Sequence, residues 1–317
     1  MSSTDRAYQV DDIVLRYHQA LEGDRGALAR LISWIERGRE VVSLLELESA
    51  DDPDANVIGI TGAPGAGKST LTDQLVGLLR LQQGDVAVLA IDPTSPFSGG
   101  AILGDRVRMN GHRGDTGVYI RSFATRGHLG GLATSVPETV TLLEHTGFRH
   151  VIIETVGVGQ VEVEIATQAD TTVVVVNPGW GDSIQANKAG LMEIADIFVI
   201  NKADRDGTRQ TRRDLENMLE LGAHRSWTPP IVETVASEGK GIDRLVEALD
   251  AHREFLVRTG ERQARRRARA VAEFERDLLR RLRQHIADDP AARSLIERVR
   301  EGLLEPRAAA RRVIDGI

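Results

Sequence analysis

Residues 62–69 have the composition of a loop that holds phosphate groups. They read Gly-Ala-Pro-Gly-Ala-Gly-Lys-Ser, the phosphate-loop pattern of two glycines separated by four residues and followed by lysine and a hydroxyl residue. Glycines let the backbone curl so that its N–H groups point at phosphates, beside the positive end of a helix dipole. A glycine-rich turn without a ligand is the alternative. The predicted nucleotide-binding residues here are Gly62, Ala63, Pro64, Gly65, Ala66, Gly67, Lys68, Ser69 and Thr70.

Three of these side chains have predicted roles. We expect Lys68 to contact the β- and γ-phosphates, and the Ser69 hydroxyl to bind Mg²⁺. Thr70 would reach the α-phosphate through its amide or its hydroxyl. The loop therefore predicts a nucleoside triphosphate and Mg²⁺ as cofactors.

A second motif, Asn201-Lys202-Ala203-Asp204, has residue types that select guanine. A carboxylate at Asp204 can accept hydrogen bonds from guanine N1–H and from the N2 amine, a donor pair that adenine lacks. Lys202 would lie along the base, and Asn201 would brace the loop. After a later strand, Ala236, Ser237 and Glu238 are expected to close over the base, although a plain strand-to-loop turn would read the same way. The two motifs together predict GTP and GDP.

Several acids fall where a GTPase binds Mg²⁺ and activates water. Glu154 stands where many GTPases place the Asp of an Asp-x-x-Gly motif, and Gly157 would sense the γ-phosphate through its amide. Asp92 and Asp105 lie on a glycine-rich segment, and either could bind Mg²⁺ or orient the attacking water. The predicted metal ligands are Ser69, Asp92, Asp105 and Glu154, and the predicted catalytic residues also include Lys68 and Gly157.

Short β-branched runs alternate with helical patterns through the middle of the chain. The run Thr-Thr-Val-Val-Val-Val at 171–176 is typical of a strand buried on both faces of a parallel sheet. Strands are predicted at 57–60, 86–91, 118–121, 151–154, 171–176, 197–200 and 231–235, with a helix at 70–81. This pattern predicts an α/β fold of the P-loop NTPase type, with a mostly parallel central sheet and helices on both faces. Ligands of such sheets bind at the carboxyl ends of the strands, where all the motifs above fall.

Helical patterns flank this region. Residues 10–47 place Leu28, Leu31, Ile32 and Ile35 on one helical face, and a polar, proline-containing stretch follows. Residues 261–283 hold nine arginines and an apolar stripe at helical spacing, with further helical segments at 289–302 and 306–314. We predict an N-terminal helical extension (1–50), a GTP-binding α/β domain (51–258) and a C-terminal helical arm (259–317).

Composition excludes several classes of function. The 317 residues contain no cysteine, so disulfides, thiolate metal sites and a cysteine nucleophile are ruled out. The net charge of -7 argues against nucleic acid as the main partner. No apolar run is long enough to span a bilayer, and the first residues lack a leader pattern. We expect no membrane association and a cytoplasmic location.

The chain resembles the MeaB/ArgK-type methylmalonyl-CoA mutase-associated GTPases, of the SIMIBI class of P-loop GTPases. The resemblance rests on GAPGAGKST, DPTSPFSGGAILGDRVRM, ETVGVGQ, GDSIQANKAGLMEIADIFVINKAD and the arginine-rich RRRAR of the C-terminal region. It covers most of residues 25–290. The string from Gly181 to Asp204 is the most specific part, because generic GTPases have nothing like it.

The resemblance implies a GTP-hydrolysing chaperone that loads and protects an adenosylcobalamin-dependent acyl-CoA mutase, with methylmalonyl-CoA mutase as the first candidate. We expect slow hydrolysis in the absence of the partner, because no arginine or glutamine stands in a motif that would fix it as a catalytic residue. It also implies a homodimer built by the C-terminal arm. Asp182 and Lys188, which alone would read as a turn and a helix start, fall on a loop that couples the partner to GTP hydrolysis and join the predicted catalytic set. The alternatives are a kinase of a transport-system protein, a metallocentre-assembly GTPase and a scaffold that does not hydrolyse GTP.

Overall fold

The computed structural model describes residues 3–47, 55–92, 110–112, 114–124, 135–155, 167–179, 193–221 and 226–315, with the backbone alone at 3–9, 83, 92, 110 and 124. The chain divides into two compact units, Met1–Arg265 and Arg266–Ile317. Each unit is described by itself below.

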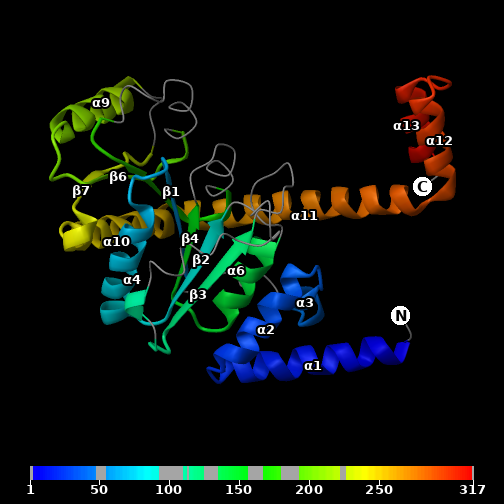
Figure 1. The fold of residues 1–317 in the computed structure, drawn as a ribbon, viewed down its shortest axis with the longest axis horizontal. Helices are drawn as coiled ribbons and strands as arrows, with labels where there is room; N and C mark the ends of the chain where they lie inside the picture. The colour runs from blue at the N-terminus through cyan, green and yellow to red at the C-terminus, as the bar shows by residue number, and fades with distance from the viewer. Residues whose placement is uncertain are drawn as a thin grey trace. The chain divides into compact units, whose positions relative to one another are not determined.

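A seven-stranded sheet forms the centre of the first unit (Figure 1). Its strands are β1 (Asn56–Gly62), β2 (Val86–Asp92), β3 (Val118–Ala124), β4 (His150–Thr155), β5 (Thr171–Val176), β6 (Ile197–Asn201) and β7 (Ile231–Thr234). The order is β3-β2-β4-β1-β5-β6-β7, and every neighbouring pair is parallel. All seven predicted strands are confirmed, with ends that differ by at most three residues.

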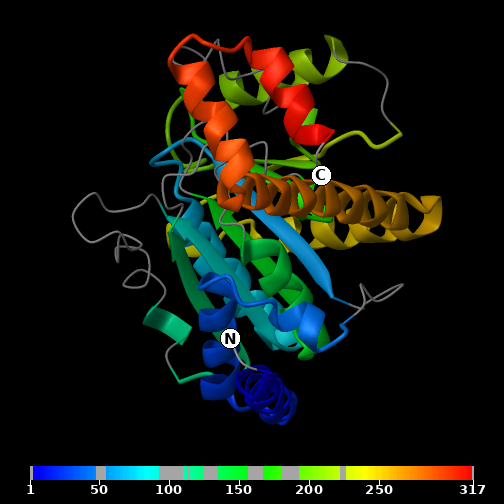
Figure 2. The ribbon, with the colours of Figure 1, turned by 90° about the vertical axis from the view of Figure 1, so that its right-hand side faces the viewer.

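Helices cover both faces of the sheet (Figures 1 and 2). On one face α4 (Lys68–Gln83) and α10 (Ile242–Thr259) pack with apolar side chains of β1, β5 and β6. On the other face α6 (Ser135–His145) and α9 (Thr208–Leu221) take part in two further clusters. The strands between these layers are buried on both sides, which explains their continuous apolar runs. The predicted α/β fold is confirmed.

The N-terminal helices share the core of the sheet. They are α1 (Ser3–Leu21), α2 (Arg25–Glu36) and α3 (Val41–Leu44), and the predicted apolar face of α2 is buried against β2, β3, β4 and α6. Polar contacts reinforce this packing, because Arg121 of β3 pairs with Glu36 and Glu138 accepts a hydrogen bond from the Val42 amide.

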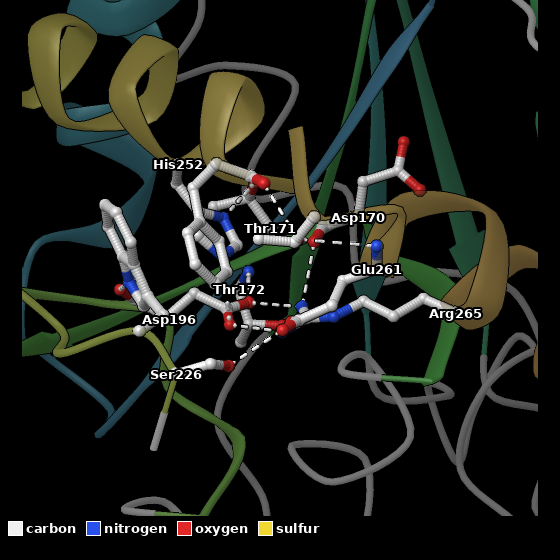
Figure 3. A network of polar contacts seen from close by, with 11 residues as sticks. Asp170, Thr171, Thr172, Asp196, Ser226, His252, Glu261 and Arg265 are labelled. Carbon is white, nitrogen blue, oxygen red and sulfur yellow. Dashed lines mark hydrogen bonds and ion pairs between the residues drawn. The ribbon is translucent and has the colours of Figure 1, made fainter. Parts of the chain in front are cut away.

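The amino-terminal edge of the sheet is closed by a buried ionic network (Figure 3). Asp170 and Asp196 stand just before β5 and β6 and are 1% and 6% exposed. Their carboxylates accept from the amides of Val57 and Thr172, so each carboxylate binds an amide of the adjacent strand. We call these two aspartates, together with Arg262, Arg265 and His252, the amino-edge network.

The two arginines of the amino-edge network belong to the first turns of α11 (Glu261–Asp288). Arg265 makes two 2.9 Å bonds to the Asp196 carboxylate and one of 3.0 Å to the Asp170 carbonyl. Arg262 donates to the carbonyl of Ala55 at 2.7 Å and lies 4.0 Å from the Asp170 carboxylate. The start of α11 is thereby fixed to the amino ends of β1, β5 and β6.

The second unit holds the rest of α11 with α12 (Pro290–Arg300) and α13 (Pro306–Ile314). Asp289 and Glu305 cap the two short helices by accepting backbone hydrogen bonds, and Ala292 and Ala309 are buried. These helices confirm the segments predicted at 289–302 and 306–314. In the part of the chain that the structure describes, no helix is long and apolar enough to cross a membrane.

Candidate nucleotide-binding site

The phosphate loop joins β1 to α4 and has room only for glycine at two points. Gly62 and Gly67 have φ angles of 137° and 91°, in the range that favours glycine. A Cβ on Gly62 would lie 2.0 Å from the Val175 carbonyl oxygen, and one on Gly67 would lie 2.3 Å from Asn201 Nδ2. The glycines of the motif are therefore required by close approach of β5 and of the base-specificity motif.

Lys68 and Ser69 begin α4 and are both nearly buried. The Lys68 ammonium donates to the carbonyls of Gly62 at 2.7 Å and Ala63 at 3.0 Å, so it lies inside the curl of the loop. The Ser69 hydroxyl donates to Glu154 Oε1 at 2.6 Å. Thr70, by contrast, is exposed in the first turn of the helix. The structure thus brings together the loop and the acid at the end of β4, which are 85 residues apart.

The donor set fits Mg²⁺. A hydroxyl and a buried carboxylate, 2.6 Å apart at a helix start, are hard oxygen ligands of the kind that Mg²⁺ prefers. Among the described residues no group of three or more His, Asp or Glu could hold a metal unaided. A Mg²⁺ at this position would take one or two protein oxygens and complete its shell with phosphate and water.

Asn201 ties the base-specificity motif to the phosphate loop. Its Nδ2 donates to the Ala66 carbonyl at 2.9 Å, and its Oδ1 accepts from the Thr234 hydroxyl and the Ala236 amide at 3.1 Å each. Lys202, with a φ of 58°, sends its ammonium 2.6 Å from the Gly65 carbonyl. The buried Asn201 amide therefore connects the ends of β6 and β7 to the phosphate loop.

The carboxylate of Asp204 is exposed, beside the turn that was predicted to close over the base. That turn is a short helix, η2 (Ala236–Glu238), in which Ala236 is buried while Ser237 and Glu238 are exposed. Lys240 follows and was not predicted from the sequence. Its hydrogen bond to Glu238 raises its pKa, and the nearby charges of Glu238 and Asp204 raise it further. In the sequence, only the position of Lys240 just after the predicted turn could have indicated that it lies near the base-binding residues.

The remaining predicted residues are placed only in part. Asp92 ends β2, the strand beside β4, but its side chain is outside the description. Asp105, Gly157, Asp182 and Lys188 lie outside the described residues.

His112 was not among the predicted site residues, and it lies in η1 (Asn110–His112) against α4. Its Nε2 is 3.0 Å from the Asp73 carbonyl oxygen. Nothing in its spacing signalled this contact.

Comparison with known proteins identifies the family. Residues 28–291 match the model of the family described as "Methylmalonyl Co-A mutase-associated GTPase MeaB". The chain belongs to this family. The matched range contains the phosphate loop, the end of β4, the base-specificity motif and η2. The protein is accordingly a GTPase of the MeaB/ArgK type.

Relatives agree with this assignment. A protein of Pyrococcus abyssi that is named as a GTPase is 48% identical over 274 residues, covering 84% of this chain and 83% of its own. The mouse protein "Methylmalonic aciduria type A homolog, mitochondrial" is 33% identical over 318 residues, covering 93% and 77%. A crystal structure named for an LAO/AO transport system kinase has a TM-score of 0.70 and 28% identity, with 96% of each chain covered.

Proposed function

We propose that this MeaB/ArgK-family GTPase is a chaperone of an adenosylcobalamin-dependent acyl-CoA mutase, with methylmalonyl-CoA mutase as the first candidate. The observation that carries the proposal is the match of residues 28–291 to a family named for association with that mutase. The name of the mouse relative, which refers to methylmalonic aciduria, supports the same partner. A cytoplasmic location is part of the proposal.

The nucleotide site supplies the working part of this chaperone. Lys68 would contact the β- and γ-phosphates of GTP from its place inside the loop, and Ser69 with Glu154 would hold Mg²⁺. When bound, the metal neutralises charge on the phosphates. Asp92 and Asp105 remain the candidates for orienting the attacking water or adding to the metal shell. Slow hydrolysis without a partner, with Gly157, Asp182 and Lys188 linking the γ-phosphate to the partner, belongs to the same proposal.

We further propose that the arm forms a homodimer. On α11 the side chains of Val271, Phe274 and Leu278 are exposed at helical spacing, which is an unfavourable arrangement for a helix facing only water. Flanking arginines and acids on the same helix pair with each other, as Asp277 does with Arg280 and Arg281. Phe274→Glu should convert a dimer into a monomer in light scattering, whereas Arg276→Glu, on an exposed part of the same helix, should leave the dimer intact.

The test of the chaperone proposal uses purified methylmalonyl-CoA mutase and adenosylcobalamin. Single-turnover GTP hydrolysis is measured with and without the mutase, and cofactor transfer to apo-mutase is followed by the cobalamin absorbance. We expect the mutase to accelerate hydrolysis and GTP to govern cofactor loading. An acyl-CoA enzyme that uses no cobalamin serves as the matched control and should change neither rate.

Three outcomes would favour the alternatives. Transfer of the γ-phosphate from labelled GTP to a transport-system protein would support the kinase, an activity that the name of the structural neighbour suggests. Hydrolysis stimulated by a nickel-enzyme precursor, and not by any cobalamin enzyme, would support a metallocentre-assembly GTPase. Binding of GTP with no hydrolysis under any condition would leave only a scaffold.

A further inference from the structure

The last two residues of β4 contact both ends of the phosphate loop. Glu154 accepts the hydrogen bond from Ser69, at the end of the loop that begins α4. Thr155 points to the opposite face of the sheet, where its hydroxyl donates to the Thr61 hydroxyl at 3.0 Å. Thr61 immediately precedes Gly62, the first residue of the loop. Two adjacent residues therefore hold the loop at its start and at its end.

The Thr61–Thr155 contact lies where β1 and β4 separate. The register between these strands runs from Asn56 opposite His150 to Ile60 opposite Glu154, and the two threonines come one residue later. β1 ends one residue later at Gly62, the first residue of the phosphate loop, and β4 ends at Thr155 itself. The hydroxyl contact thus extends the connection between the strands past the end of their ladder.

Packing alone does not require hydroxyls at these two positions. Thr61 and Thr155 are both fully buried, and a valine side chain would fill nearly the same volume with a methyl group in place of each hydroxyl. A buried hydroxyl is costly unless it finds a partner, and here each hydroxyl provides the other's partner. The pair joins two elements of the nucleotide site in a defined geometry, which two valines could not do.

We propose that Thr155 is a positioning residue for GTP hydrolysis. Through Thr61 it fixes the distance between the exit of β4 and the phosphate loop, and so keeps the Glu154 carboxylate where it meets Ser69. Small errors in such placement reduce the rate of chemistry more than they reduce ground-state binding. The inference rests on GTP hydrolysis alone and not on the mutase partner. The positioning role of Thr155 and the proposed chaperone function can therefore be refuted independently.

The experiment compares Thr155→Val, Thr61→Val, the double variant and Thr155→Ser. Single-turnover hydrolysis gives the rate of chemistry, a fluorescent GDP gives ground-state affinity, and thermal unfolding gives stability. Loss of one net hydrogen bond corresponds to roughly a five- to tenfold change in rate. We expect Thr155→Val to slow hydrolysis about five- to tenfold while GDP affinity stays within about twofold, and Thr155→Ser to restore the rate.

The double variant adds an independent readout. Because Thr61→Val leaves the Thr155 hydroxyl without its partner, the double change should slow hydrolysis no further than Thr155→Val alone. It also keeps the comparison open if one single variant folds poorly, since it replaces both hydroxyls with matched apolar groups.

Thr139→Val is the matched control. Thr139 is a fully buried threonine of α6 whose hydroxyl bonds to the Ser135 carbonyl, away from the loop. It should lower the melting temperature without slowing hydrolysis. If Thr155→Val behaves in the same way, with the rate within twofold of the wild type, the role of the pair is structural only and the proposal is wrong. A Thr155→Ser variant as slow as Thr155→Val would overturn it as well.

Discussion

The two edges of one sheet use polar residues in opposite ways. At the carboxyl edge the side chains of Lys68, Asn201 and Lys202 bond to carbonyls of the phosphate loop, while Thr70 and Asp204 are exposed. At the amino edge the charged residues are buried except Arg265, which is half-buried, and they bond to one another and to strand ends (Figure 3). The same strands, β1, β5 and β6, connect the two edges.

This difference implies that the carboxyl edge serves nucleotide binding and that the amino edge serves the stability of the fold. Polar groups that bond to a loop which a ligand can also contact leave donors and acceptors available for recognition. Buried polar groups that bond to one another are not available to a ligand, and removing one of them leaves its charged partner without compensation. Substitutions at the amino edge should therefore change the free energy of unfolding, and substitutions at the carboxyl edge should change nucleotide affinity and rate.

The largest effect is expected from Asp196→Ala. It removes both bonds to Arg265, the cap on the Thr172 amide and the carboxylate nearest His252. Breaking a fully buried pair from one side costs about 3–5 kcal/mol, and because Arg265 is only half-buried we expect a loss of about 3 kcal/mol of unfolding free energy. Urea denaturation should show this loss, while GTP hydrolysis per folded molecule stays within about twofold.

Asp277→Ala is the control for that change. Asp277 pairs with Arg280 and Arg281 on the surface of α11, where such pairs contribute up to about 1 kcal/mol. Equal losses in the two variants would mean that the amino-edge network is no more important than a surface ion pair.

Next in size is Lys68→Ala at the carboxyl edge. A bond from a charged donor is worth about 1.5–3 kcal/mol, so affinity for GTP should fall about 10- to 100-fold. The unfolding free energy should change less than in Asp196→Ala, because the carbonyls of Gly62 and Ala63 that lose the Lys68 ammonium are neutral. GTP titration and urea denaturation test both parts, and an unchanged GTP affinity would contradict the assigned role.

The sequence predicted the carboxyl edge far better than the amino edge. Phosphate-loop and guanine motifs are local strings whose residue types are dictated by the ligand, so Lys68, Ser69 and Asn201 could be assigned before any contact was known. Likewise the six-residue run of β5 predicted burial on both faces, and all six residues are buried. The partnership of Ser69 with Glu154 followed from motif order, although their 2.6 Å contact did not.

The amino edge was missed because its partners are far apart in sequence and ordinary in type. Arg262 belongs to an arginine-rich stretch that would be expected on a solvated helix, but it is 4% exposed and bonds to Ala55, 207 residues away. Asp170 and Asp196 are single acids before strands, with no motif around them. Only the three-dimensional arrangement shows that these charges neutralise each other.

Base selectivity gives a third test, with a smaller effect at the carboxyl edge. Asp204→Asn replaces the carboxylate expected to accept from guanine N1–H and N2 with an amide. GTP affinity should fall about tenfold and affinity for xanthosine triphosphate should rise, since its base presents an acceptor where guanine has the amine. Competition between the two nucleotides measures the shift. Asp243→Asn, in the first turn of α10, is the control and should not alter the preference.

The smallest expected effect is a pH dependence of the unfolding free energy that arises from His252 at the amino edge. The imidazole is fully buried, its Nδ1 is 2.9 Å from the Thr171 hydroxyl and its Nε2 is 3.4 Å from Asp196 Oδ1. Burial lowers its pKa; the charges of Asp196, Glu261 and Asp170 oppose this, and that of Arg265 adds to it. The folded protein therefore keeps the ring neutral at a pH where the unfolded chain, with a histidine pKa of about 6.5, already binds a proton.

Because the unfolded state then binds more protons, acid favours unfolding. Above about pH 6.5 His252 is neutral in both states and adds no pH dependence. As the pH falls below that value, stability should be lost at up to about 1.4 kcal/mol per pH unit, until the folded-state pKa is passed. Urea denaturation between pH 5 and 8 should show a shallower slope for His252→Gln than for the wild type, with the same pH dependence of GTP affinity in both. Equal slopes would show that the ring titrates alike in both states, and a changed GTP profile would show that the two edges are not independent.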